Sequence, residues 1–150
     1  MLKVGDRAPV FSGVDQNGKT VRLTDLKGSK VVLYFYPKDM TPGCTVEACG
    51  FRDGHGAIQK KGAVVLGVSK DGSASHKKFI EKHQLPFSLL ADESGEIVKA
   101  YGAWGEKSMY GKKYMGILRI TYVIGADGRV SAVFPKVKPA THAEEVLAVL

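Results

Sequence analysis

The sequence predicts a three-layer α/β fold with a mixed central sheet, and two observations support this prediction. Apolar runs typical of buried strands alternate along the chain with segments of helical periodicity, as in sheets that carry helices on their faces. The last apolar stretch is instead interrupted by Asp127-Gly128, a strong signal for a β-hairpin. A sheet that contains both crossover strands and a hairpin is a mixed one.

The strands are predicted in chain order. Residues 1–28 contain strand fragments and turns, and Asn17-Gly18 marks an N-terminal β-hairpin. The run SKVVLYFY is continuous, β-branched and aromatic, which is typical of a buried strand. The predicted strands after the first hairpin cover residues 29–36, 63–69, 87–92 and, as a pair around Asp127-Gly128, 119–135.

Helices fit between these strands. One is expected to follow Pro42, and the segment HKKFIEKH places residues 76, 79, 80 and 83 on one face of another. The remaining two are predicted over residues 93–101 and 142–150. Thioredoxin-like topology is the simplest arrangement that accommodates this order of elements.

Length and composition are those of a single globular domain spanning residues 1–150. The chain is long enough for a real core, and its 44% hydrophobic and 25% charged composition is not that of a disordered chain. No apolar run reaches membrane-spanning length, and MLKVGDRAPVF lacks the pattern of a signal peptide. The expected location is therefore the cytoplasm, with no membrane contact.

A net charge of +7 raises the question of nucleic-acid binding. The basic residues are scattered from Lys3 to Lys138, and the densest local cluster is only Lys107, Lys112 and Lys113. A solvated surface explains this distribution best, and a contact patch for an acidic partner comes second. No nucleic-acid partner is therefore expected.

The only two cysteines, Cys44 and Cys49, both lie in the stretch YFYPKDMTPGCTVEACGFRD. Two cysteines are too few for a secreted disulfide scaffold of this length, and a close pair in a reducing compartment indicates redox chemistry. Pro42 suits the first turn of a helix, which places Cys44 in that turn. The free N–H groups and positive end of a helix favour an anion there, and a thiolate is the nucleophilic form of cysteine.

The two sulfurs cannot meet while this helix is intact. Residues 44, 48, 51, 55 and 58 form a stripe that is expected to face the sheet, whereas Cys49 lies about 140° round the helix and about 7.5 Å along it. A disulfide between them requires unwinding. Gly50, Gly54 and Gly56 each weaken the helix by about 1 kcal/mol relative to alanine, although they could equally allow close packing or end the helix early.

Other cysteine chemistries fit less well. The spacing is not the Cys-x-x-Cys of a disulfide exchanger, and a zinc site needs more ligands than this pair supplies. A Cys-His dyad stays open, although the four histidines are expected at the surface or the core edge. The pattern favours oxidation of an activated Cys44 to a sulfenic acid, which Cys49 then resolves.

The active-site stretch resembles that of a known family. Pro37-x-x-x-Thr41-x-x-Cys44 is similar to the peroxiredoxin signature, and Cys49 at this offset resembles the bacterioferritin comigratory, or Q-type, branch. Supporting similarity extends almost end to end, through VGDRAPVF, SHKKF, LPFSLLAD, WGEKSMYGKKYMGILRITYVI and PKVKPATHAEEVL. The resemblance implies a thioredoxin-like fold, reduction of hydroperoxides, and no metal or bound cofactor.

The resemblance also implies a role for each matching residue. Cys44 corresponds to the peroxidatic cysteine and Cys49 to the resolving one. Thr41 corresponds to the hydroxyl that touches thiolate and peroxide, Arg119 to the guanidinium that completes the pocket, and Pro37 to the residue that shields it. Arg119 is always charged and carries a fork of donors, which suits it to a thiolate and to a departing oxygen.

Three details complete this expectation. Thr41 could also act as the helix N-cap, and the backbone N–H groups of Gly43 and Cys44 could bind peroxide oxygens. Glu47 is expected at the pocket rim or in solvent, capping the first turn. The chain departs from the family pattern at Ile120, Tyr122, Thr141 and Gly50, none of which carries the inferred chemistry.

The predicted cycle reduces a hydroperoxide at Cys44, forms an intramolecular disulfide with Cys49, and returns to the dithiol through a thioredoxin-like protein. A monomer is expected because one chain supplies both sulfurs. Two alternatives remain. A thioredoxin-like disulfide reductase or binding module would exchange with protein disulfides, and a basic nucleic-acid-binding domain would show salt-dependent binding.

Overall fold

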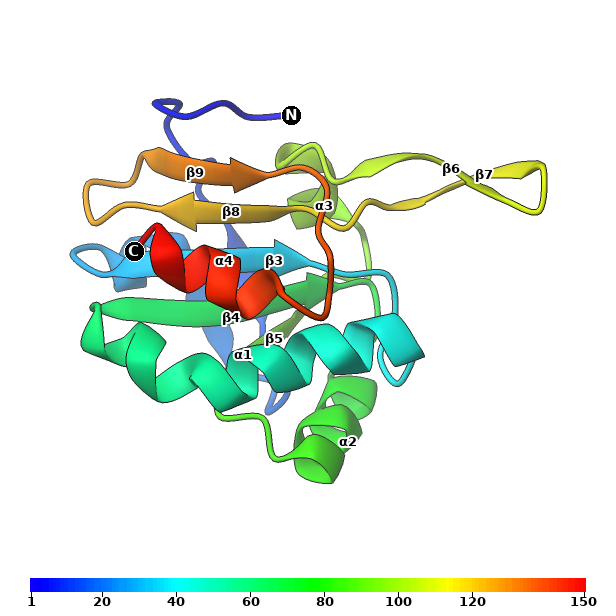
Figure 1. Ribbon diagram of the computed structural model, residues 1–150, viewed down its shortest axis with the longest axis horizontal. Coiled ribbons are helices and arrows are strands. Elements are labelled where there is room, and N and C mark those ends of the chain that lie inside the picture. The colour runs from blue at the N-terminus through cyan, green and yellow to red at the C-terminus, as the bar shows by residue number, and fades with distance from the viewer.

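The computed structural model describes residues 1–150 and has a seven-stranded mixed sheet at its centre (Figure 1). The strand order is β2-β1-β5-β4-β3-β8-β9, and β6 and β7 form a separate two-stranded sheet. The elements are β1 (Ser12–Val14), β2 (Thr20–Arg22), the 3₁₀ helix η1 (Leu23–Leu26), β3 (Lys30–Phe35), α1 (Pro42–Lys60), β4 (Ala63–Ser69), α2 (Ser73–His83), β5 (Ser88–Ala91), α3 (Glu96–Ala100), β6 (Trp104–Met109), β7 (Lys112–Ile117), β8 (Thr121–Ile124), β9 (Val130–Phe134) and α4 (His142–Ala148).

The sheet is parallel at its centre and antiparallel toward its edges. β3 pairs in parallel with β4, which pairs in parallel with β5, whereas β8 runs antiparallel to β3 and to β9. Every residue of β3 after Lys30 is buried, as expected for a strand covered on both faces. The mixed sheet predicted from the sequence is confirmed.

Helices and the N-terminal segment cover the two faces of the sheet. Cys44, Ala48, Phe51 and Ile58 of α1 belong to one core cluster, together with buried side chains of α2 and α4. The other cluster contains residues of α3 and of the N-terminal segment. These layers confirm the three-layer prediction, and they place the predicted stripe of α1 against the sheet.

Both predicted hairpin turns are present. The turn containing Gly18 joins β1 to β2, and the turn containing Gly128 joins β8 to β9. Both glycines have positive φ, +77° and +82°, which other residues rarely adopt. The hairpin of β6 and β7 has no counterpart in the sequence prediction, and it projects from the body of the protein (Figure 1). Its residues are mostly exposed, so it lacks the apolar pattern that revealed the buried strands.

Helix α1 continues through all three of its glycines to Lys60, so the suggestion that they end it early is wrong. A Cβ at Gly50 would lie 3.6 Å from the Cβ of Ala143 in α4, an ordinary packing distance. Gly54 and Gly56 face open space, so close packing does not explain the glycine at either position. No helix of the structure is both long enough and apolar enough to cross a membrane.

Candidate active site

Cys44 lies in the first turn of α1, which follows β3 after the loop of residues 36–41. Its side chain is 1% exposed and packs with the core cluster beneath the helix. The turn is closed by the N–H of Thr45, which donates to the carbonyl of Thr41 at 2.9 Å. The first N–H groups of a helix have no partner within it, and Cys44 lies among them, in the turn that the sequence predicted.

Arg119 lies just before β8, the strand that neighbours β3, and it reaches the sulfur from there. Because β8 pairs antiparallel with β3, the residues just before β8 lie at the same end of the sheet as the residues just after β3. The N–H of Phe35 donates to the carbonyl of Ile120 at 2.9 Å, and this bond fixes the neighbouring residue, Arg119. Arg119 Nη2 then donates to Cys44 Sγ at 3.3 Å.

Glycine at position 43 permits this approach. A Cβ at Gly43 would lie 3.3 Å from Arg119 Nη2, which is tighter than ordinary van der Waals contact. A larger residue would therefore push the guanidinium away from the sulfur.

Glu47 is the carboxyl partner that orients the Arg119 guanidinium. The prediction that Glu47 lies at the pocket rim or in solvent is wrong. The side chain is fully buried, and its Oε1 accepts a hydrogen bond of 2.7 Å from Arg119 Nη1. Burial raises the pKa of Glu47 from 4.5 to about 7, although the adjacent guanidinium opposes this rise. Glu47 lies three residues after Cys44, on the same side of the helix, and this spacing was the available sequence signal for an inward position.

Thr41 and Pro37 belong to the loop that leads from β3 into α1. Thr41 occupies the residue before the helix, but its side chain makes no capping hydrogen bond. Its Oγ1 instead donates to the carbonyl of Lys38 at 2.8 Å, so side-chain capping by Thr41 is not found. Pro37 is partly buried at the start of this loop. The structure therefore joins Cys44, Arg119 and Glu47 directly and places Thr41 and Pro37 in the segment that precedes them.

Cys49 lies on the same helix and is only partly buried. Both cysteines are free thiols, and α1 is continuous between them. An ideal helix separates their positions by about 140° and about 7.5 Å, so the sulfurs meet only if the helix start unwinds.

Lys107 of β6 adds a second cation beside the site. Burial lowers the pKa of its ammonium, and the Arg119 guanidinium lowers it further. Its Nζ donates to the carbonyl of Ile117 at 2.9 Å. The three lysines therefore differ in burial, since Lys112 and Lys113 are exposed near the tip of the hairpin while Lys107, farther from the tip in β6, is half-buried.

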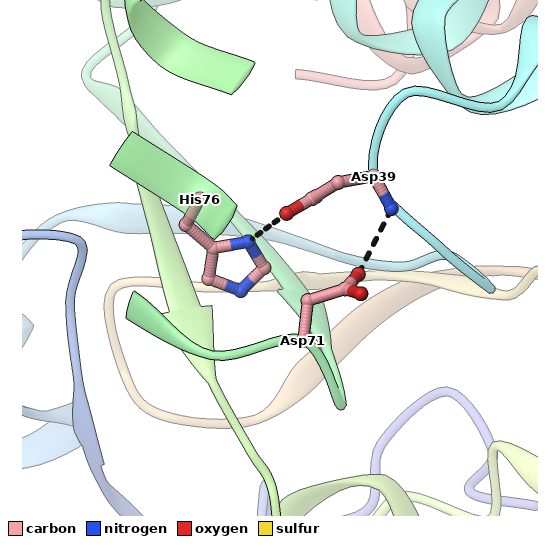
Figure 2. A group of neighbouring side chains, drawn as sticks. All are labelled: Asp39, Asp71 and His76. Atoms are coloured by element: carbon pink, nitrogen blue, oxygen red, sulfur yellow. Dashed lines mark hydrogen bonds and ion pairs between the residues drawn. The ribbon is translucent and has the colours of Figure 1, made fainter. Parts of the chain in front are cut away.

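Two histidines are fully buried, which corrects their expected place at the surface or the core edge. His142 of α4 accepts or donates one hydrogen bond at Nε2, 2.7 Å from Thr121 Oγ1, and burial lowers its pKa to about 4. His76 of α2 lies among Asp39 and Asp71, with side-chain ligand atoms of the three within 4.8 Å of one another (Figure 2). Since both ring nitrogens of His76 already have protein partners, this group is arranged as a hydrogen-bond network.

Comparison with known proteins identifies the family. Residues 4–133 match the AhpC/TSA family, and Peroxiredoxin Bcp of Escherichia coli K12 is 50% identical over 146 residues, 97% of this chain and 94% of that one. The chain belongs to the AhpC/TSA family, in its peroxiredoxin Bcp branch. The resemblance predicted from the active-site stretch is thereby confirmed.

Solved peroxiredoxin structures also share the fold. PrxQ of Xylella fastidiosa, solved as a cysteine-to-serine variant, gives a TM-score of 0.93 at 34% identity over 99% of this chain and 94% of that one. A bacterioferritin comigratory protein of Xanthomonas campestris, described for its alkyl peroxide reduction activity, gives 0.87 at 38% identity over 92% of this chain and 88% of that one. The thioredoxin-like peroxiredoxin fold is thus confirmed.

Proposed function

We propose that this peroxiredoxin reduces hydrogen peroxide and organic hydroperoxides at Cys44, with Cys49 as the resolving cysteine. The observation that carries the proposal is the 3.3 Å hydrogen bond from Arg119 Nη2 to a buried sulfur at the start of a helix. A positive helix end and a guanidinium both stabilise a thiolate. The alkyl peroxide activity named for the Xanthomonas relative supports the substrate class.

In the first step the Cys44 thiolate attacks one peroxide oxygen. The sulfur supplies two electrons, an S–O bond forms, the O–O bond breaks, and the leaving oxygen departs as water or alcohol after taking a proton. Arg119 stabilises the thiolate beforehand and the negative charge on the leaving oxygen during the step. We assign to Thr41 and to the N–H groups of Gly43 and Cys44, which lie at the helix start, the role of orienting the peroxide. Pro37 is assigned the role of shielding the pocket from the side of the loop.

In the second step the start of α1 unwinds and Cys49 attacks the Cys44 sulfenic acid. An S–S bond forms, and the sulfenic oxygen leaves as water with the proton of the Cys49 thiol. A thioredoxin-like dithiol protein then exchanges with this disulfide and restores both thiols. We further propose that residues 1–150 act as one domain and as a monomer, in the cytoplasm, where unpaired cysteines stay reduced.

Rapid mixing with peroxide followed by intact-mass measurement tests this cycle. The wild type should lose two hydrogens as the disulfide forms, and Cys49→Ser should gain one oxygen on Cys44. Cys44→Ser should consume no peroxide. Normal turnover by Cys49→Ser with the same reductant would remove Cys49 from the cycle, and peroxide consumption by Cys44→Ser would refute the proposed function itself.

A further inference from the structure

The segment between β3 and α1 has a backbone that needs support from its surroundings. Met40 has a φ of +65°, in the left-handed region that residues other than glycine rarely adopt. Such a conformation persists only where neighbouring contacts hold it in place. The next residue, Thr41, accepts the first hydrogen bond of α1. Whatever holds this segment therefore also determines where α1 starts and where Cys44 lies.

Asp39 provides that support by joining the segment to two other elements. Its Oδ1 accepts a hydrogen bond of 2.6 Å from the Tyr36 hydroxyl, and its Oδ2 accepts one of 2.8 Å from Ser75 Oγ in α2. Its backbone N–H donates to Asp71 Oδ2 at 2.9 Å (Figure 2). Asp71 Oδ2 is held in turn by Ser69 Oγ at the end of β4, at 2.7 Å.

His76 completes the network from inside the core. Its Nε2 lies 2.9 Å from the carbonyl oxygen of Leu90, and a carbonyl only accepts, so Nε2 carries a proton. Its Nδ1 lies 2.7 Å from Asp39 Oδ2 (Figure 2). Only two arrangements fit this contact: an imidazolium donating to a carboxylate, or a protonated carboxyl donating to a neutral ring.

The surroundings favour Asp39 as a carboxylate that accepts hydrogen bonds. The groups that face His76 are the carboxyls of Asp39 and Asp71 and the hydroxyl of Tyr36, while β5 offers only the carbonyl of Leu90. Burial alone would raise the pKa of Asp39, but hydrogen bonds from His76 and Tyr36 lower it below its usual value.

We propose that the buried Asp39–His76 pair is a positioning device for the peroxide reaction. It holds residues 37–41 so that α1 starts at Pro42 and Cys44 meets Arg119, and its loosening releases the helix start toward Cys49. The proposal rests on the function proposed above. His76 touches no reacting atom, so it acts through the backbone of the segment it holds. Loosening the pair should therefore slow sulfenic acid formation at Cys44 and speed disulfide formation, with water as the other product of that second step.

Two amide substitutions separate the two hydrogen bonds of His76. In His76→Asn the amide nitrogen takes the place of Nδ1 and keeps a donor toward Asp39. In His76→Gln it reaches the place of Nε2, which keeps the donor toward Leu90 and removes the one toward Asp39. His83→Gln is the matched control, because His83 ends the same helix and its ring packs against Phe79, outside the network.

Quenched rapid mixing with hydrogen peroxide, read by intact mass, measures the two steps separately. Gain of one oxygen in a Cys49→Ser background reports oxidation of Cys44, and loss of two hydrogens with Cys49 present reports the disulfide. His76→Gln should slow the first step about tenfold and speed the second, a size expected when a reacting group is misplaced by a fraction of an ångström. His76→Asn should restore both rates toward those of the wild type.

Each other outcome has a definite meaning. Equal effects of His76→Gln and His76→Asn on both steps, or no effect of either, would overturn the positioning role. If His76→Gln does not fold, Ser75→Ala removes a different donor to the same Asp39 oxygen. That variant must then slow the oxidation of Cys44 and speed disulfide formation. Failure of Cys44 to gain oxygen in the Cys49→Ser protein with native His76 would instead contradict the proposed function, so the two failures are distinguishable.

Discussion

Arg119 donates to two acceptors with one guanidinium. It donates to Cys44 Sγ at 3.3 Å through Nη2 and to Glu47 Oε1 at 2.7 Å through Nη1. The planar fork holds these two N–H groups in fixed directions, which a lysine ammonium cannot reproduce. Glu47 therefore acts on the sulfur indirectly, by setting the angle from which Arg119 approaches it.

Replacement of Arg119 by lysine should expose this dependence on geometry. Because the charge stays but the fork is lost, we expect the rate of Cys44 oxidation to fall about 100-fold or more, the usual cost of removing one donor to a developing oxyanion. Rapid mixing with peroxide in the Cys49→Ser background measures it. Arg129→Lys is the control, since that exposed side chain bonds only the carbonyl of Gly5. Equal rates in the Arg119→Lys and Arg129→Lys proteins would show that charge alone is sufficient.

The raised pKa of Glu47 predicts how stability depends on pH. Since this pKa moves from 4.5 to about 7 on folding, the folded protein binds a proton more tightly than the unfolded chain. The resulting stability is fully present below the unfolded value and is lost as pH rises through the folded one. Between those two values the wild type should lose up to about 3 kcal/mol of unfolding free energy relative to Glu47→Gln. Urea unfolding of both proteins across this range measures the difference, and a constant difference would contradict the pKa shift.

The proposed cycle requires helix α1 to stay folded along most of its length and to unwind at its start. The side chains of Ala48, Phe51 and Ile58 anchor it to the sheet. Gly50 follows Cys49 directly, and its position tolerates a methyl group because the nearest atom, Ala143 Cβ, would be 3.6 Å away. The glycine therefore weakens the helix beside Cys49, the proposed resolving cysteine, without being required by packing.

Gly50→Ala should slow the resolving step. Alanine stabilises a helix by about 1 kcal/mol relative to glycine, which corresponds to about a fivefold lower rate if α1 must unwind at this residue. The measured quantity is the rate of disulfide formation after peroxide addition, with the rate of Cys44 oxidation unchanged. Gly56→Ala is matched to it, because Gly56 lies in the same helix and faces open space. Equal slowing by both variants would mean that unwinding extends well beyond Cys49.

The sequence predicted buried elements better than exposed ones. β3 and β4 were predictable because strands covered on both faces must be apolar throughout. The hairpin of β6 and β7 was not, since its residues are mostly exposed and carry no such constraint. Among the site residues, Cys44 and its position at a helix start could be predicted from the neighbouring residues. The spacing of Glu47 from Cys44 indicated its side of the helix, but its partner could not be predicted locally, because Arg119 lies 72 residues away in the sequence.

The division of the core into two clusters determines what can open and what stays closed. The helices α1, α2 and α4 share one cluster, and α3 and the N-terminal segment share the other, with the sheet between them. The central strands are held by backbone hydrogen bonds on both sides, β3 by β4 and β8. We expect that unwinding of the start of α1 would remove Cys44 from one cluster and leave these strand pairings intact.

Hydrogen exchange should therefore locate the change that accompanies oxidation. In the disulfide form we expect faster amide exchange over residues 37–50, together with the part of α4 near Ala143 that faces Gly50. Strands β3, β4 and β8 should keep their protection, because local opening leaves their ladders unbroken. Exchange read by mass spectrometry on reduced and peroxide-treated protein measures this, and Cys49→Ser treated in the same way should show little change, since its helix can stay wound. Faster exchange throughout the sheet would mean that resolution requires opening of the whole core, and the partition of the protein into a fixed sheet and a movable helix start would be wrong.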